Sequence, residues 1–205
     1  VNLTMNGRKN RISYRLVKLD KEERVIDLNK PQLLKGFNEV TKGNGYYKAR
    51  LSTAASPKEL MAGNYMLRSI SKAKNTDHVI YTMESFEQYP DLHYATLDFK
   101  KSIRLTHGID QQKDYLWGTA ELVSWISLDG RKLEGVVYKP ADFDPAKKYP
   151  MIVSFYERNS ETLFNYRMPE PHRSTIDYHL YNSNGYIVFN PDIRYVDGYP
   201  GESCY

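Results

Sequence analysis

Two apolar runs near the end of the 205-residue chain constrain its fold more than any other feature. They are Tyr149–Glu157 (YPMIVSFYE) and Gly185–Arg194 (GYIVFNPDIR), each about as long as a strand and rich in Val, Ile, Phe and Tyr. Neither run alternates between apolar and polar residues, which is typical of a parallel strand that is covered on both faces. The segment between them is long enough for a crossover and too long for a hairpin. The pair therefore predicts the beginning of an α/β unit.

The composition indicates a folded, β-rich protein. Apolar residues make up 40% of the chain and aromatic residues 13%, which is enough to build a core. The 18 tyrosines fit strands and half-buried positions, the places that this residue favours. An excess of tyrosine can also provide stacking surfaces for sugars, so a binding function stays open at this point.

Charge and cysteine content exclude several classes of function. The formal net charge is only +4, and the basic pairs Lys100-Lys101 and Lys147-Lys148 are interpreted as solvated turns, so nucleic acid is not an expected partner. The single cysteine, Cys204, excludes an intrachain disulfide. No 18-residue apolar segment is present, so no membrane span is predicted. The first residue is not Met and no leader pattern follows, so we expect an internal cut.

Short strands are predicted throughout the first half. The pattern places them at residues 11–19, 25–28, 46–51, 65–70, 78–83, 94–98 and 102–106, and it leaves 31–37 ambiguous. One short helix is predicted after Ser56, with Pro57 at its first position, Glu59 three residues after the cap and Gly63 at its end. Strands that recur at this spacing favour a sandwich, a barrel or a propeller.

The pattern of recurring short strands changes near residue 118, where we place a domain boundary. From Glu121 onward, strands at 122–127 and 133–138 flank Asp129-Gly130, which predicts a β-hairpin. Pro140 ends the hairpin, and a polar link leads into the first apolar run.

The order of these elements resembles the prolyl oligopeptidase family of serine peptidases. The similarity is carried by WISLDGRKLEGVVYKP, YPMIVSFY and NGYIVFNPDIR followed by GYPGES, from about Glu121 to Tyr205. The resemblance implies a mixed β and α/β fold. Residues 1–118 would be the last blades of a β-propeller, and 119–205 the N-terminal part of an α/β-hydrolase domain.

The resemblance also implies an activity, the hydrolysis of short peptides by an acyl-enzyme route, with no cofactor. Such peptidases occur in the cytoplasm and in the cell envelope, so the compartment stays open. The family carries its nucleophile in a G-x-S-x-G elbow, which this chain lacks. Ser203 follows a turn-rich loop rather than a strand, so it is not expected to be the nucleophile. We expect the triad beyond residue 205, so this chain alone would be inactive and would need the remainder of the catalytic domain.

One catalytic group is expected within the chain. Tyr156 occupies the position of the family's tyrosine that donates a hydrogen bond to the oxyanion. Family members commonly have glycines after this tyrosine, whereas Glu157-Arg158 follows here, so the loop is expected to differ. The alternative is that Tyr156 is an aromatic residue packed at the end of a strand.

Other candidate residues are weaker. Asp192 and Arg194 are expected to pair and fix the loop after the second run. The loop at residues 158–178 is either a substrate contact or a rigid surface cover. His172 and His179 are more simply explained as structural residues than as metal ligands, and no metal site is predicted. The rival to the peptidase is a non-catalytic β-rich module that binds glycans or peptides through exposed tyrosines.

Overall fold

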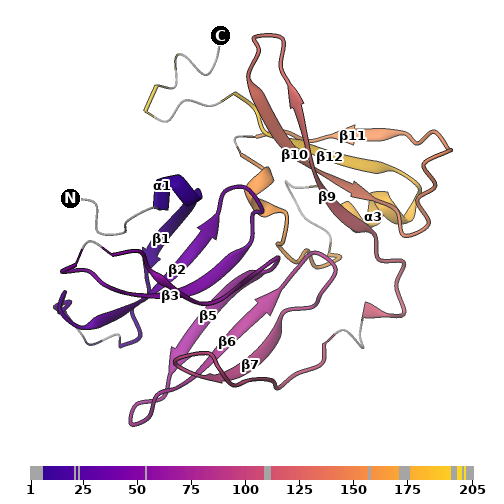
Figure 1. The fold of residues 1–205 in the computed structure, drawn as a ribbon. Helices are drawn as coiled ribbons and strands as arrows, with labels where there is room; N and C mark the ends of the chain where they lie inside the picture. The colour runs from indigo at the N-terminus through magenta and orange to yellow at the C-terminus, as the bar shows by residue number, and fades with distance from the viewer. Residues whose placement is uncertain are drawn as a thin grey trace. The chain divides into compact units, whose positions relative to one another are not determined.

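A computed structural model describes residues 7–20, 22, 24–53, 55–108, 112–156, 158–170, 176–194, 198, 199 and 201. The chain divides into two compact units (Figure 1). The first unit contains residues 1–85 and 90–108, and the second contains 86–89 and 109–205. No helix in the described ranges is long and apolar enough to cross a membrane.

The first unit consists of two antiparallel sheets of four strands each. The first sheet has the order β1-β2-β3-β4, and the second has the order β5-β6-β7-β8. Each strand pairs with its neighbour in sequence, which is the arrangement of a propeller blade. The elements are α1 (Gly7–Asn10), β1 (Ile12–Leu16), β2 (Pro31–Asn38), β3 (Asn44–Arg50), β4 (Lys58–Gly63), β5 (Met66–Lys72), β6 (His78–Glu84), β7 (Asp91–Thr96) and β8 (Ser102–Arg104).

Aromatic rings from both sheets form the core of the first unit. Tyr46 of β3 stacks on Phe99 with 4.8 Å between ring centroids, and it meets Tyr81 of β6 edge-on at 5.9 Å. The Tyr81 hydroxyl also forms a hydrogen bond of 2.8 Å with Ser102 Oγ on β8. Leu67 and Ala95, both fully buried, complete the contact. The two sheets are therefore joined by a shared core of buried side chains from both.

The second unit is built on a third sheet, of order β11-β12-β10-β9. β9 and β10 form the predicted hairpin, with Gly130 in its turn at φ +79°. β11 and β12 are parallel, which confirms the predicted parallel pair. The elements are β9 (Thr119–Ile126), β10 (Lys132–Lys139), β11 (Met151–Val153), the 3₁₀ turn η1 (Ser160–Thr162), α3 (Tyr178–Ser183) and β12 (Ile187–Pro191).

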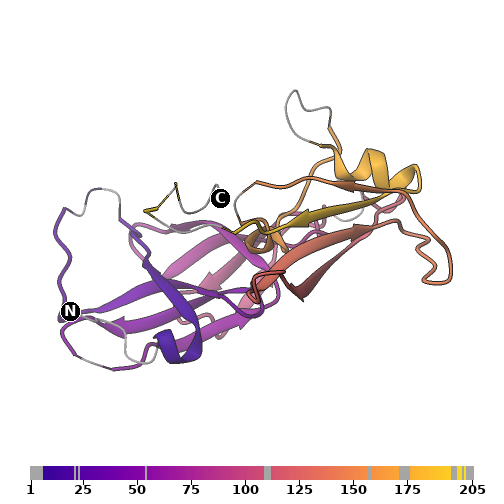
Figure 2. The same ribbon diagram turned by 90° about the horizontal axis from the view of Figure 1, so that it is seen from above.

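The crossover between β11 and β12 covers one face of this sheet. Figure 2 shows α3 lying over it, and the core beneath contains Val136, Tyr138 and Val188, all fully buried. Asp177 caps α3 by accepting hydrogen bonds from the backbone N–H of His179 and Leu180. The third sheet therefore combines an antiparallel hairpin with one parallel crossover unit.

Two sequence predictions in the first unit are wrong. The helix expected after Ser56 is instead the strand β4, because pairing with β3 across the sheet outweighs the local capping signal. The strand expected at residues 25–28 does not form, and β1 pairs with β2 instead. β2 contributes the buried Leu33 and Leu34, whereas Val25 is 79% exposed.

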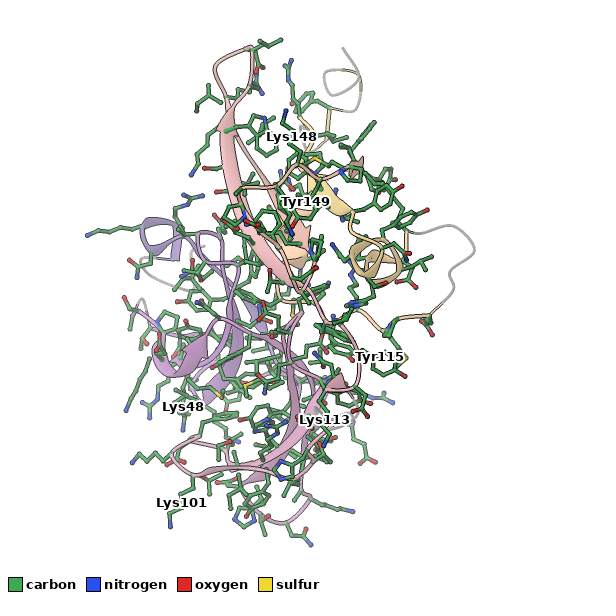
Figure 3. All side chains as sticks on the ribbon, turned by 90° about the vertical axis from the view of Figure 1, so that its right-hand side faces the viewer. Lys48, Lys101, Lys113, Tyr115, Lys148 and Tyr149 are labelled. Atoms are coloured by element: carbon green, nitrogen blue, oxygen red, sulfur yellow. The ribbon has the colours of Figure 1, made fainter. Side chains whose placement is uncertain are left out.

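The first apolar run is also less buried than predicted. Met151 and Val153 of β11 are each half exposed, because β11 is an edge strand of the third sheet within the described residues. The basic pairs do lie in exposed loops, as interpreted, and Figure 3 labels Lys101 and Lys148. Just before β11, the Tyr149 hydroxyl accepts a 2.8 Å hydrogen bond from Asp144 N, which fixes the entry to the strand (Figure 3).

Candidate functional site

Tyr156 lies in the loop that leaves the carboxyl end of β11. Ser154 N donates a hydrogen bond of 2.9 Å to Phe189 O, so the parallel ladder guides the chain up to this loop. The Tyr156 side chain is 75% exposed, and its hydroxyl has no hydrogen-bond partner among the described residues. This exposure does not match the alternative of a packed strand-end aromatic, and the oxyanion role of Tyr156 stays a prediction.

A pocket of about 450 Å³ opens beside this tyrosine. Its wall is formed by the carboxyl ends of β11 and β12, the described part of the long loop and the start of α3; it includes Tyr156, Asn159, Arg167, Asp177, Tyr178 and Asn190. The carboxyl ends of parallel strands are where α/β sheets usually bind ligands. The geometry therefore marks this edge of the third sheet as the candidate site.

Long-range hydrogen bonds hold the loop after Tyr156. Asn159 Nδ2 donates to the backbone oxygens of Tyr156 and Pro191, each at 3.1 Å, and so ties the loop to the end of β12. Asp192 accepts from Ser160 N at 2.7 Å and from Ser160 Oγ at 2.6 Å. The predicted pairing of Asp192 with Arg194 is therefore wrong, because both carboxylate oxygens bind the start of η1 instead.

The loop at residues 158–178 divides between cover and pocket in its described parts. Leu163 is buried in the core of the second unit, and the Tyr166 ring stacks on Trp117 at 5.2 Å. Arg167 and Met168, which follow directly, line the pocket instead. The packed residues Leu163 and Tyr166 therefore anchor the loop, and the adjoining Arg167 and Met168 face the pocket.

The histidines of this region are structural where they are described. His179 is buried, with its ring stacked on Phe86 and 4.0 Å from Trp117. Its Nε2 bonds to Arg167 O at 2.7 Å, and burial lowers its pKa. His172, Ser203 and Cys204 lie outside the described residues. Across the described ranges, no cluster of His, Cys, Asp or Glu could hold a metal ion.

A layer of aromatic rings supports the floor of the pocket. Tyr178 stacks on Tyr138 at 4.4 Å and accepts a hydrogen bond from Asn190 Nδ2. Burial raises the pKa of Tyr138 to about 12, so this phenol stays protonated at neutral pH. The guanidinium of Arg167 lies 5.2 Å from the centre of the Tyr178 ring. No sequence pattern distinguishes Asn159, Arg167 or Asn190, because only the fold brings them to the pocket beside Tyr156.

Comparison with known proteins identifies the fold. No protein-family model and no curated protein matches the chain. AtxE2 isopeptidase with Astexin3-dC4 bound matches over 92% of this chain and 32% of its own, with 11% identity and a TM-score of 0.53. The acylaminoacyl peptidase of Pyrococcus horikoshii matches over 81% and 24%, with 17% identity and a TM-score of 0.57.

A putative dipeptidyl aminopeptidase IV from Bacteroides ovatus matches over 81% of this chain and 23% of its own, with 21% identity and a TM-score of 0.53. The chain thus spans about a third or less of each of these structures. At sequence identities of 11% to 21%, the similarity to these structures shows the fold alone. The chain therefore has the fold of a segment of these peptidases, consistent with the prolyl oligopeptidase family that its motifs resemble.

Proposed function

We propose that this chain is part of a serine peptidase of the prolyl oligopeptidase type, which hydrolyses peptide bonds of short peptides through an acyl-enzyme. Residues 1–118 would belong to a β-propeller and 119–205 to the N-terminal part of an α/β-hydrolase domain. The observation that carries the proposal is the free hydroxyl of Tyr156 beside a pocket at the carboxyl end of β11, in a chain with this fold.

The role of Tyr156 follows from the chemistry of acyl transfer. When a serine Oγ attacks the scissile carbonyl, its proton passes to a base and the carbonyl oxygen becomes negative. A fixed phenol O–H can donate a hydrogen bond to that oxygen and lower the barrier. The chain has no G-x-S-x-G, so the nucleophile and its triad would lie beyond residue 205.

Peptides are the proposed substrates. Among proteins of this fold, AtxE2 isopeptidase has been solved with Astexin3-dC4, and an acylaminoacyl peptidase with Z-Gly-Gly-Phe-chloromethyl ketone. The second of these matches over 81% of this chain and 24% of its own, with 16% identity and a TM-score of 0.53. The pocket beside Tyr156 has the size of a small-ligand site, and polar groups line it together with aromatic rings.

The binding-module alternative receives less support from the placement of the tyrosines. Among the described residues, Tyr46, Tyr47, Tyr81 and Tyr138 are buried in cores, whereas Tyr115, Tyr156, Tyr186 and Tyr199 are exposed. Core packing therefore accounts for part of the tyrosine surplus without a glycan.

Labelling with a fluorophosphonate probe tests the proposal. In the full-length protein that contains this chain, we expect one serine beyond residue 205 to react, and a covalent serine-hydrolase inhibitor to abolish the reaction. The labelled serine is located by mass spectrometry after digestion. Absence of labelling in a folded protein, together with binding of glycans or peptides without turnover, would instead support the non-catalytic module.

A further inference from the structure

Arg167 and Asp177 are the charged side chains that line the pocket beside Tyr156 within the described residues. The pocket wall contains one arginine and no lysine among its described residues. The guanidinium lies over the Tyr178 ring and near the buried Tyr138 hydroxyl. Its charge lowers the pKa of Tyr138 and so offsets part of the increase that burial causes. Aromatic rings and a phenol thus surround the positive charge.

Asp177 and Asp192 are carboxylates in this part of the chain, and Asp177 also lines the pocket. Asp177 Oδ1 accepts two backbone N–H groups at the start of α3. Both oxygens of Asp192 bind Ser160. Within the described residues Arg167 makes no ion pair, and its buried Nε has no hydrogen-bond partner. A half-buried guanidinium that makes no ion pair can bind an incoming carboxylate through its N–H groups.

The backbone of Arg167 is held in place, which favours a binding role over a mobile surface role. Its carbonyl oxygen accepts the bond from His179 Nε2 at 2.7 Å, and the His179 ring itself contacts the rings of Phe86 and Trp117. The neighbouring Tyr166 ring stacks on Trp117. The contact of the guanidinium with the Tyr178 ring also restricts the side chain, so less side-chain freedom is lost when a ligand binds.

We infer that Arg167 determines substrate specificity by binding a carboxylate of the peptide in the pocket beside Tyr156. The inference rests on the proposed peptidase function for its kinetic consequence, but carboxylate binding itself does not require it. Two sources share this chemistry: an acidic side chain near the scissile bond, and the free C-terminus of a short peptide. Tyr156 and Arg167 would then act on the same ligand, one on the reacting carbonyl and the other on its charged group.

Two matched peptide pairs distinguish the sources. One pair is blocked at both ends and carries Glu or Gln at a single position near the scissile bond; the other ends in a free carboxylate or in an amide. On the full-length protein we expect the carboxylate member of one pair to have a kcat/KM about tenfold higher. The pair that shows the preference identifies the source. Below about pH 4 the preference falls, because the carboxylate becomes protonated.

Substitution of Arg167 completes the test. Arg167→Met keeps the apolar contact with Tyr178 and should remove the preference, whereas Arg167→Lys should retain part of it. Lys148→Met, an exposed lysine of the same unit (Figure 3), removes an equal charge and should leave the preference intact. Thermal unfolding confirms that each variant is folded. An unchanged preference in Arg167→Met, or no preference in the native protein, would overturn the inference.

Calorimetric binding of the same peptides separates this inference from the proposed function. If the carboxylate peptide binds about tenfold more tightly than its neutral partner, and Arg167→Met removes the difference, the inference holds even if no serine is labelled. If a serine is labelled and peptides are cleaved without any effect of their charge, the peptidase stands and the inference fails.

Discussion

Two tyrosines, Tyr46 in the first unit and Tyr156 in the second, lie in opposite environments. In the first unit Tyr46 points from the middle of β3 into the core and is 1% exposed, with rings stacked around it. In the second unit Tyr156 follows the end of the edge strand β11 and is 75% exposed. The same side chain stabilises a sheet where it lies inside the strand pattern, and it offers a free hydroxyl where the strand stops. For these two residues, position relative to the strand end therefore separates a buried ring from an exposed one.

Removal of a buried tyrosine from the first unit should have the largest effect on stability. Tyr46→Ala leaves a cavity between the first and second sheets, and we expect the free energy of unfolding of this unit to fall by about 4 kcal/mol. Urea unfolding, with hydrogen exchange followed at β3 and β6, measures the loss in this unit alone.

The exposed Tyr115 provides the matched control (Figure 3). Tyr115→Ala should change the free energy of unfolding by no more than about 0.5 kcal/mol. An equal loss in the free energy of unfolding for Tyr46→Ala and Tyr115→Ala would show that burial does not determine how much a tyrosine contributes to stability.

Loss of the bond between Asp192 and Ser160 should have a smaller and more local effect. Asp192→Ala leaves the buried N–H and Oγ of Ser160 without their partner, at a cost of about 2 kcal/mol in the second unit. Because the freed segment follows Tyr156, we expect kcat to fall about tenfold while KM changes less.

Ser160→Ala distinguishes an effect on the position of the loop after Tyr156 from an effect on the stability of the second unit. It removes only the hydroxyl bond and keeps the backbone bond, so it should cost about 1 kcal/mol and affect kcat less. If Asp192→Ala destabilised the unit without any change in kcat, the loop would not position Tyr156.

Local patterns in the sequence predicted most of the strands but not the contacts of the site. The Asp129-Gly130 turn defined the β9–β10 hairpin, because this signal lies within a few residues. The two apolar runs predicted the parallel pair, because each run has the pattern of a strand and the segment between them is long enough for a crossover. Ser56-Pro57 failed as a helix start because pairing with β3 decided the conformation of β4. The hydrogen bonds that fix the loop after Tyr156 join residues 32 positions apart, and no local pattern encodes them.

The kinetics of Tyr156→Phe in the full-length protein test directly whether the Tyr156 hydroxyl stabilises the oxyanion. The change removes one oxygen from an exposed ring, so the fold should be unaffected, and Tyr115→Phe is the matched control. If the hydroxyl stabilises the oxyanion, kcat/KM for a peptide substrate falls about 100- to 1000-fold in Tyr156→Phe and stays unchanged in the control. A value within about twofold of the native protein would contradict the account, because the hydroxyl would then contribute nothing to the transition state.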